Sequence, residues 1–190
     1  GDPEDYELVS ESLLRRLVTQ DGDTAPQTRT QVARLLGVLD RSYRIPLLHH
    51  LLQDASVSVQ RAAVRAAGKT GDRSFLHPLI ERLGRDATEA AARQALASFG
   101  PPILGTLYDY LVDSAVDLET RRRIPPIFVE HPGPFAVAAL VRGLKKTPVP
   151  LRHAITRALS KLHQTAEASP NAETLDAAIR NETRHHAALG

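Results

Sequence analysis

Apolar residues recur along this chain at helical spacing, and the whole pattern repeats about every thirty residues. One column of equivalent apolar positions consists of Leu36, Ala67, Leu96, Ile127 and Leu159, which are 31, 29, 31 and 32 residues apart. Each position has the same phase within a segment whose hydrophobicity has the helical period. The pattern therefore predicts one helix at each position of this column.

A second column of apolar helical segments falls between the members of the first. It consists of residues 47–51, 79–83, 107–111 and 140–144, whose first residues are 32, 28 and 33 apart. Two alternating helices per period indicate a helical hairpin that stacks on copies of itself, because one hairpin cannot bury its own apolar face. The sequence predicts an all-α fold, an α-solenoid of about five helix pairs.

The chain length suits one domain with a substantial core, so a single α-solenoid domain is expected over residues 1–190. Asp2 followed by Pro3 is a favourable helix start, and Tyr6, Val9, Leu13 and Leu17 follow at helical spacing. This first helix is expected to cap the stack. The predicted parts are an N-terminal capping helix at 1–20, repeats at 27–163 and a C-terminal helix at 171–190.

Composition limits the classes of function. The 24 basic and 22 acidic residues leave a net charge of only +2, and no run of apolar residues is long enough to cross a membrane, so a soluble piece is expected. Without cysteine there is no disulfide and no thiolate nucleophile, while the compartment stays open between the bacterial cytoplasm and the periplasm. Because the chain starts at Gly1 and has no methionine, we expect a piece of a longer product.

The second repeat is the most regular. It reads Val-Gln-Arg-Ala-Ala-Val-Arg-Ala-Ala-Gly over residues 59–68, followed by a Gly71-Asp72 turn and an apolar helix up to Leu83. This segment resembles the HEAT family, particularly the short bacterial HEAT-like repeats related to phycobilisome lyases, and the resemblance extends over about 135 residues. It implies a solenoid of HEAT-like helix pairs. The resemblance lies in the repeats alone, and no cysteine is present to guide a bilin, so chromophore attachment is not expected.

The carboxy-terminal half is also similar to the soluble HEAT-like segment of some bacterial nucleotide-exchange carriers of the major facilitator type. The matching residues are Arg123-Ile124-Pro125, Leu159-Ser160-Lys161-Leu162 and Glu182. This resemblance implies the soluble part or partner of a bacterial membrane transport system, associated with the membrane. It brings no transport residues with it, because the spanning helices lie outside this sequence.

HEAT repeats often carry an Asp after the outer helix and an Arg inside the next helix, and the two can connect neighbouring turns into a ladder. Asp54 with Arg61, and Asp86 with Arg93, fit that spacing. The resemblance implies a structural role for these four side chains.

Residues 99–135 depart from the regular pattern. They hold five of the eight Phe and Tyr residues and six of the 13 prolines, and Pro125 and Pro126 fall inside the fourth helix of the first column, which should start late or bend. Two interpretations are open: an irregular but filled core, or an apolar cleft for a hydrophobic small molecule such as a lipid or a sterol-like compound. The candidate cleft residues are Phe99, Ile103, Leu104, Leu107, Tyr108, Tyr110, Ile124, Ile127, Phe128 and Phe135.

Candidate chemistry is sparse. In each of the pairs His49-His50 and His185-His186, the two histidines cannot both face the same metal ion, because adjacent helical residues point about 100 degrees apart. HEAT-like enzymes of the deoxyhypusine hydroxylase type use His-Glu dipeptides as iron ligands, and this sequence has none. The one basic run, Arg121-Arg122-Arg123, together with balanced charge and no tryptophan, disfavours nucleic acid as a partner.

The sequence therefore favours a non-catalytic HEAT-repeat binding module with no cofactor, metal site or catalytic residue. We expect it to hold a protein partner along its concave inner-helix surface, with a membrane transporter as the partner that the second resemblance implies. Two alternatives stay open: a carrier of a hydrophobic small molecule in the cleft of residues 99–135, and a nucleic-acid-binding HEAT protein.

Overall fold

A computed structural model describes residues 3–19 and 25–167, and every regular element within those ranges is a helix. The all-α prediction is confirmed. Contacts divide the chain into two compact units, unit 1 (Gly1–Ser98) and unit 2 (Phe99–Gly190). The single-domain organisation stays a prediction, and the helix expected at 171–190 lies outside the described residues.

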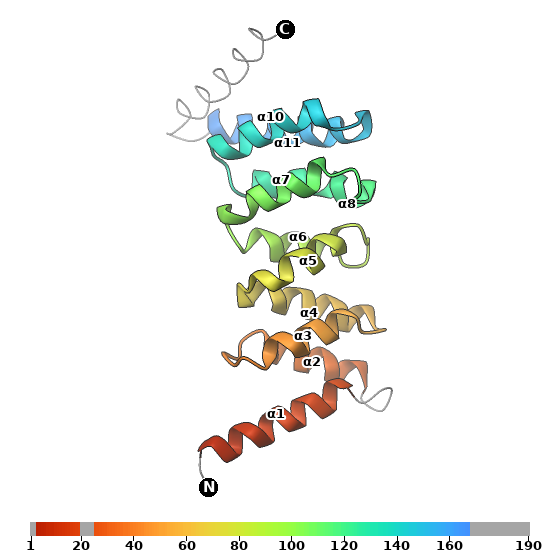
Figure 1. Cartoon of the computed structure of the whole chain (residues 1–190), viewed down its shortest axis with the longest axis vertical. Coiled ribbons are helices and arrows are strands. Elements are labelled where there is room, and N and C mark those ends of the chain that lie inside the picture. Colours follow the sequence, from red (N-terminus) through yellow and green to blue (C-terminus); the bar gives the residue numbers. More distant parts are fainter. Residues whose placement is uncertain (1–2, 20–24, 168–190) are drawn as a thin grey trace. The chain divides into compact units, whose positions relative to one another are not determined.

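Unit 1 is built from successive helical hairpins, which Figure 1 shows one after another in the order of the chain. Its elements are α1 (Pro3–Thr19), α2 (Pro26–Leu36), α3 (Arg44–Leu52), α4 (Val57–Thr70), the 3-10 turn η1 (Arg73–Phe75), α5 (Leu76–Leu83) and α6 (Glu89–Ala97). The helices of the first sequence column, α2, α4 and α6, pack on one another in that order, while α3 packs on α4 and α5 packs on α6. This is the α-solenoid arrangement that the two columns predict.

Consecutive inner helices come very close to each other at equivalent positions of the repeats. A Cβ atom added to Gly37 of the first hairpin would lie 2.9 Å from Ala66 Cα, and one added to Gly68 would lie 2.7 Å from Ala95 Cα. Leu36, Ala67 and Leu96, the column residues beside these contacts, are fully buried. Small residues at these positions therefore let consecutive inner helices share one continuous apolar interior.

The first helix packs on α2 and α3, as expected for a capping helix, but through a different stripe of side chains. Leu14 and Val18 are buried, whereas Leu13 is 52% exposed. The buried side of α1 thus passes through Leu14 and Val18, one residue later than the Leu13 and Leu17 positions that the sequence predicts. Both stripes have helical spacing, and only the position of the neighbouring helices decides which one is covered.

Unit 2 follows the same plan with less regular helices. Its elements are the 3-10 turn η2 (Pro101–Ile103), α7 (Leu104–Val112), α8 (Leu118–Arg123), α9 (Pro125–Val129), α10 (Pro134–Lys146) and α11 (Val149–Glu167). The long helix α11 packs on α8, α9 and α10, and α10 also packs on α7. The second column recurs here as α7 and α10, with Leu107, Leu111 and Leu140 fully buried.

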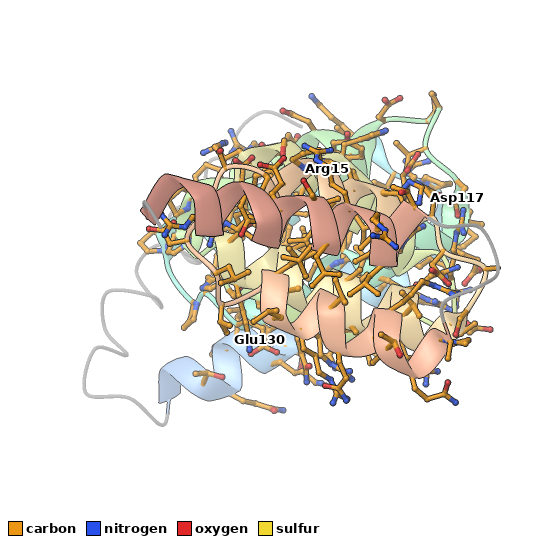
Figure 2. The ribbon with its side chains drawn as sticks, turned by 90° about the horizontal axis from the view of Figure 1, so that it is seen from below. Arg15, Asp117 and Glu130 are labelled. Atoms are coloured by element: carbon orange, nitrogen blue, oxygen red, sulfur yellow. The ribbon has the colours of Figure 1, made fainter. Side chains whose placement is uncertain are left out.

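The fourth inner helix is broken at its prolines, as the sequence indicates. α8 ends at Arg123 and α9 begins at Pro125, with Ile124 buried between them. Proline lacks the backbone donor that a continuous helix needs, so two short helices replace one long helix. The start of α8 is fixed by Asp117, labelled in Figure 2, whose side chain accepts a hydrogen bond from the Thr120 backbone N–H at 2.9 Å.

Candidate functional site

The exposed side of α4 carries a line of positive charge. Arg61, Arg65 and Lys69 are four residues apart and all exposed, so they follow one side of the helix. The opposite side of α4 is buried through Val59, Ala63 and other small apolar residues. The sequence thus places its apolar residues against the neighbouring helices and leaves three cations toward solvent.

The helices on either side of α4 contribute equivalent positions. Arg34 on α2, Arg65 on α4 and Gln94 on α6 are 31 and 29 residues apart, the same separations as in the buried column, and all three are exposed. Because α2, α4 and α6 pack side by side, these residues lie on one face of unit 1. We call Arg34, Arg61, Arg65 and Lys69 the basic face.

Most of this charge has no acidic partner. Where side chains are described, at residues 11–19 and 25–165, no salt bridge or side-chain hydrogen bond is found for Arg34, Arg65 or Lys69. Arg61 Nε donates to the backbone oxygen of Ala87, which fixes the side chain and leaves its charge uncompensated. An anion approaching the basic face therefore need not displace an internal carboxylate.

Arg29, by contrast, is held by a carboxylate. Its Nε lies 2.7 Å from Asp54 Oδ2 and its Nη2 lies 3.0 Å from Asp54 Oδ1, a bidentate pair, and Asp54 Oδ1 also accepts from the Ser56 backbone N–H. Burial alone would raise the pKa of Asp54, but the hydrogen bonds from Arg29 and Ser56 outweigh it and hold that pKa below its ordinary value. This pair connects α2 to the loop before α4.

The Asp54 partner corrects the ladder predicted from the sequence. Asp54 pairs with Arg29, 25 residues earlier, and not with Arg61, seven residues later. The physical reason is that the loop after α3 lies beside α2, within reach of Arg29, whereas Arg61 donates to the loop after α5. Arg93 Nε lies 3.5 Å from Glu89, and the predicted pair of Asp86 with Arg93 stays a prediction.

The candidate cleft residues of unit 2 are mostly packed into its core. Ile103, Leu104, Leu107, Ile124, Ile127 and Phe128 are at most 3% exposed. Phe99, Tyr108 and Tyr110 are half-buried, and Phe135 is 49% exposed. The Arg142 guanidinium lies 5.4 Å from the centre of the Tyr108 ring, in a cation–π contact. Burial of the six apolar residues agrees with a filled core, and a cleft for a hydrophobic ligand stays a prediction.

Neither a metal site nor a membrane span is found in the part of the chain that the structure describes. Among the described side chains, those of 11–19 and 25–165, no three from His, Asp or Glu are grouped so that they could bind a metal ion. Nor does any helix in those ranges combine the length and the apolar character needed to cross a bilayer.

Sequence reasoning did not single out Arg34, Arg65 or Lys69. The sequence does contain a signal for them, because basic residues recur at the solvent-exposed positions of α2 and α4. The fold, however, is predicted from the apolar positions of the same helices, which are the buried ones. Arginines are also abundant along this chain, so their number alone says little about a site.

Stacked helical hairpins define the class of this protein as a helical-repeat protein. A model of the HEAT repeats family matches residues 10–100, which contain the basic face. Residues 10–100 are therefore HEAT-like repeats. No match was found among the curated proteins.

Among solved structures, human deoxyhypusine hydroxylase in complex with glycerol is similar at 20% sequence identity and a TM-score of 0.37, over 95% of this chain and 77% of that chain. Likeness at that level supports no inference about the activity of this chain. None of these comparisons concerns a transport system, so the transport link stays a prediction.

Proposed function

We propose that this chain is a non-catalytic binding module that holds an acidic segment of a partner protein on the basic face of unit 1. The observation that carries the proposal is the set of exposed cations on α2 and α4 that have no internal carboxylate partner. Opposite charge on a partner would lower the repulsion among these cations and steer the encounter. HEAT-like repeats supply the rigid helices on which such a surface can be preorganised.

An acidic protein segment suits this face better than a nucleic acid. The line of cations on α4 is not continued on α6, where the equivalent residues, 29 positions later, are the uncharged Ala90, Gln94 and Ser98. A nucleic acid carries phosphates at regular spacing and gains affinity with each one that is neutralised, so a short cluster of four cations holds it weakly. A protein segment can place its carboxylates opposite α2 and α4 and neutral residues opposite α6. A membrane transporter is one protein that could carry such a segment, and the proposal does not depend on it.

Site-specific photo-crosslinking in cells tests the proposal. A benzoylphenylalanine at Gln94, in line with Arg65, should capture a protein, and the captured peptide should be rich in Asp and Glu. The matched control places the same group at Glu81, an exposed position on the outer helix α5. Nuclease treatment before analysis separates direct capture from capture through nucleic acid.

Equal capture from both positions would contradict the proposal, as would a captured peptide without acidic residues. Loss of all capture after nuclease treatment would also contradict it and favour the nucleic-acid alternative.

A further inference from the structure

Unit 2 has a hollow of about 680 Å³ between α8 and α11, and it shares no residue with the basic face of unit 1. It is lined by Arg122, Pro150, His153, Thr156 and Arg157. All five lining residues are exposed, so the hollow is an open depression of the surface. Pro150, His153 and Arg157 are three and four residues apart and follow one exposed side of α11, and Arg122 of α8 borders the same depression. The volume is in the range of small-molecule sites, about 300–1,000 Å³.

The polar groups of this hollow are almost all hydrogen-bond donors. Arg122 and Arg157 each present a guanidinium, and His153 adds an imidazole. Thr156 Oγ1 donates to the Arg152 backbone oxygen at 2.8 Å, so its hydroxyl proton is already used. No carboxylate lines the hollow, although Glu119 lies 2.8 Å from Arg122 Nη1 on the exposed side of α8.

The two basic side chains that α11 contributes to the hollow, His153 and Arg157, have no acidic partner among the described residues. Among the side chains of residues 11–19 and 25–165, neither His153 nor Arg157 has an ion-pair or hydrogen-bond partner. The pair of Arg122 with Glu119 is solvent-exposed, with both side chains about half accessible, and pairs of that kind contribute little. A ligand with more charge than one carboxylate could therefore compete for Arg122.

We propose that the hollow binds an organic phosphomonoester. Two guanidinium groups on separate helices match the several oxygens and the double negative charge of such a group, because each planar fork can engage two oxygens. The hollow is larger than one oxyanion requires, and the Pro150 ring together with the arginine stems forms an apolar wall for the organic part. The phosphate is carried either by a free small molecule or by a phosphorylated side chain of a protein.

Calorimetric titration of the full chain tests this proposal. The probes are phenyl phosphate, benzoate, inorganic phosphate, and a nine-residue peptide with one phosphoserine together with its unphosphorylated form. We expect phenyl phosphate to bind more tightly than benzoate or inorganic phosphate. Arg157→Gln should weaken that binding about tenfold or more, whereas Arg85→Gln, an exposed arginine of unit 1, should leave it unchanged. Circular dichroism confirms that each variant is folded.

A phosphopeptide that binds more tightly than phenyl phosphate supports the proposal and assigns the phosphate to a protein; the opposite order supports it and assigns a small molecule. Arg122→Gln provides a second variant on the other helix, with the same expected weakening. The proposal is overturned if benzoate binds as tightly as phenyl phosphate, if no phosphorylated probe binds at millimolar concentration, or if both folded Arg→Gln variants bind as the unaltered chain does.

Discussion

Gly68 lies against Ala95 so closely that a Cβ atom on Gly68 would come within 2.7 Å of both Ala95 Cα and Ala95 Cβ. The contact joins the inner helices α4 and α6, and Gly37 makes the equivalent contact with Ala66 one repeat earlier. Backbone atoms cannot yield as a flexible side chain can, so the two glycines set the distance between consecutive inner helices.

Gly68→Ala is predicted to destabilise the protein, even though alanine is the better helix former. Overpacking costs about 1–3 kcal/mol, which outweighs a helix-propensity gain of about 1 kcal/mol. The control is Gly105→Ala on α7, where nothing lies within 4 Å of the added atom and a gain of about 0.5 kcal/mol is expected. Urea denaturation followed by circular dichroism gives the change in the free energy of unfolding for both variants. A stabilising Gly68→Ala would contradict the close packing of α4 on α6.

Asp54→Asn is predicted to lower stability at neutral pH by about 1–3 kcal/mol, because it removes a partly buried bidentate ion pair with Arg29. The pKa of Asp54 is depressed in the folded state, so its contribution is present above the ordinary carboxyl pKa and is lost as the pH falls through the depressed value. Below about pH 4 the difference between the variant and the unaltered chain should therefore shrink.

Thermal melts from pH 2 to pH 7 measure that difference. Asp40→Asn is the control, because the Asp40 carboxylate is fully exposed and lies 3.4 Å from Arg44. We expect no measurable change in that variant. A stability difference for Asp54→Asn that stays constant over the whole range would show that Asp54 acts through something other than its charge.

Arg82 is predicted to act mainly by packing. The residue is 2% exposed, its Nη2 donates to the Leu52 backbone oxygen, and its Nε has no partner within the described residues. Both variants leave the Leu52 oxygen without its donor, but only Arg82→Ala also leaves a cavity, so it should cost about 2–4 kcal/mol, whereas Arg82→Met should cost only about 1 kcal/mol. Chemical denaturation of both variants checks this, and equal losses would show that the hydrogen bond to Leu52 dominates.

Asp117→Ala is predicted to destabilise unit 2 by about 1 kcal/mol, because the side chain caps α8 through the Thr120 backbone N–H. Asp117→Asn should retain most of that stability, since asparagine is an equally good cap. Hydrogen exchange of the amides at the start of α8 reports the effect locally. If the Ala and Asn variants exchange at the same faster rate, the charge of Asp117 matters more than the cap.

The fold was predictable because burial at helical spacing repeats with a nearly fixed period, and Leu36, Ala67 and Leu96 are all fully buried as that period requires. Details that depend on the neighbouring element were not predictable. The stripe on α1 passes through Leu14 instead of Leu13 because α2 and α3 cover that side.

The sites were harder to predict, because they too depend on which elements lie side by side in the fold. Asp54 has Arg61 as the nearer arginine in the sequence, but the loop lies beside α2, so Arg29 holds it. Likewise, Arg122 and Arg157 come from helices far apart in the sequence, and only the packing of α8 on α11 places them around one hollow. The break in the inner helix was the exception, since Pro125 carries its own backbone constraint.

Binding of the crosslinked partner segment to charge-reversal variants tests the central claim most directly. Arg65→Glu with Lys69→Glu changes the net charge by four units on the basic face, and Arg73→Glu with Arg85→Glu makes the same change on η1 and on the loop after α5. The account predicts that the first pair weakens binding about tenfold or more at low salt, while the second pair has a much smaller effect. Equal weakening by the two pairs, or none by the first, would contradict it.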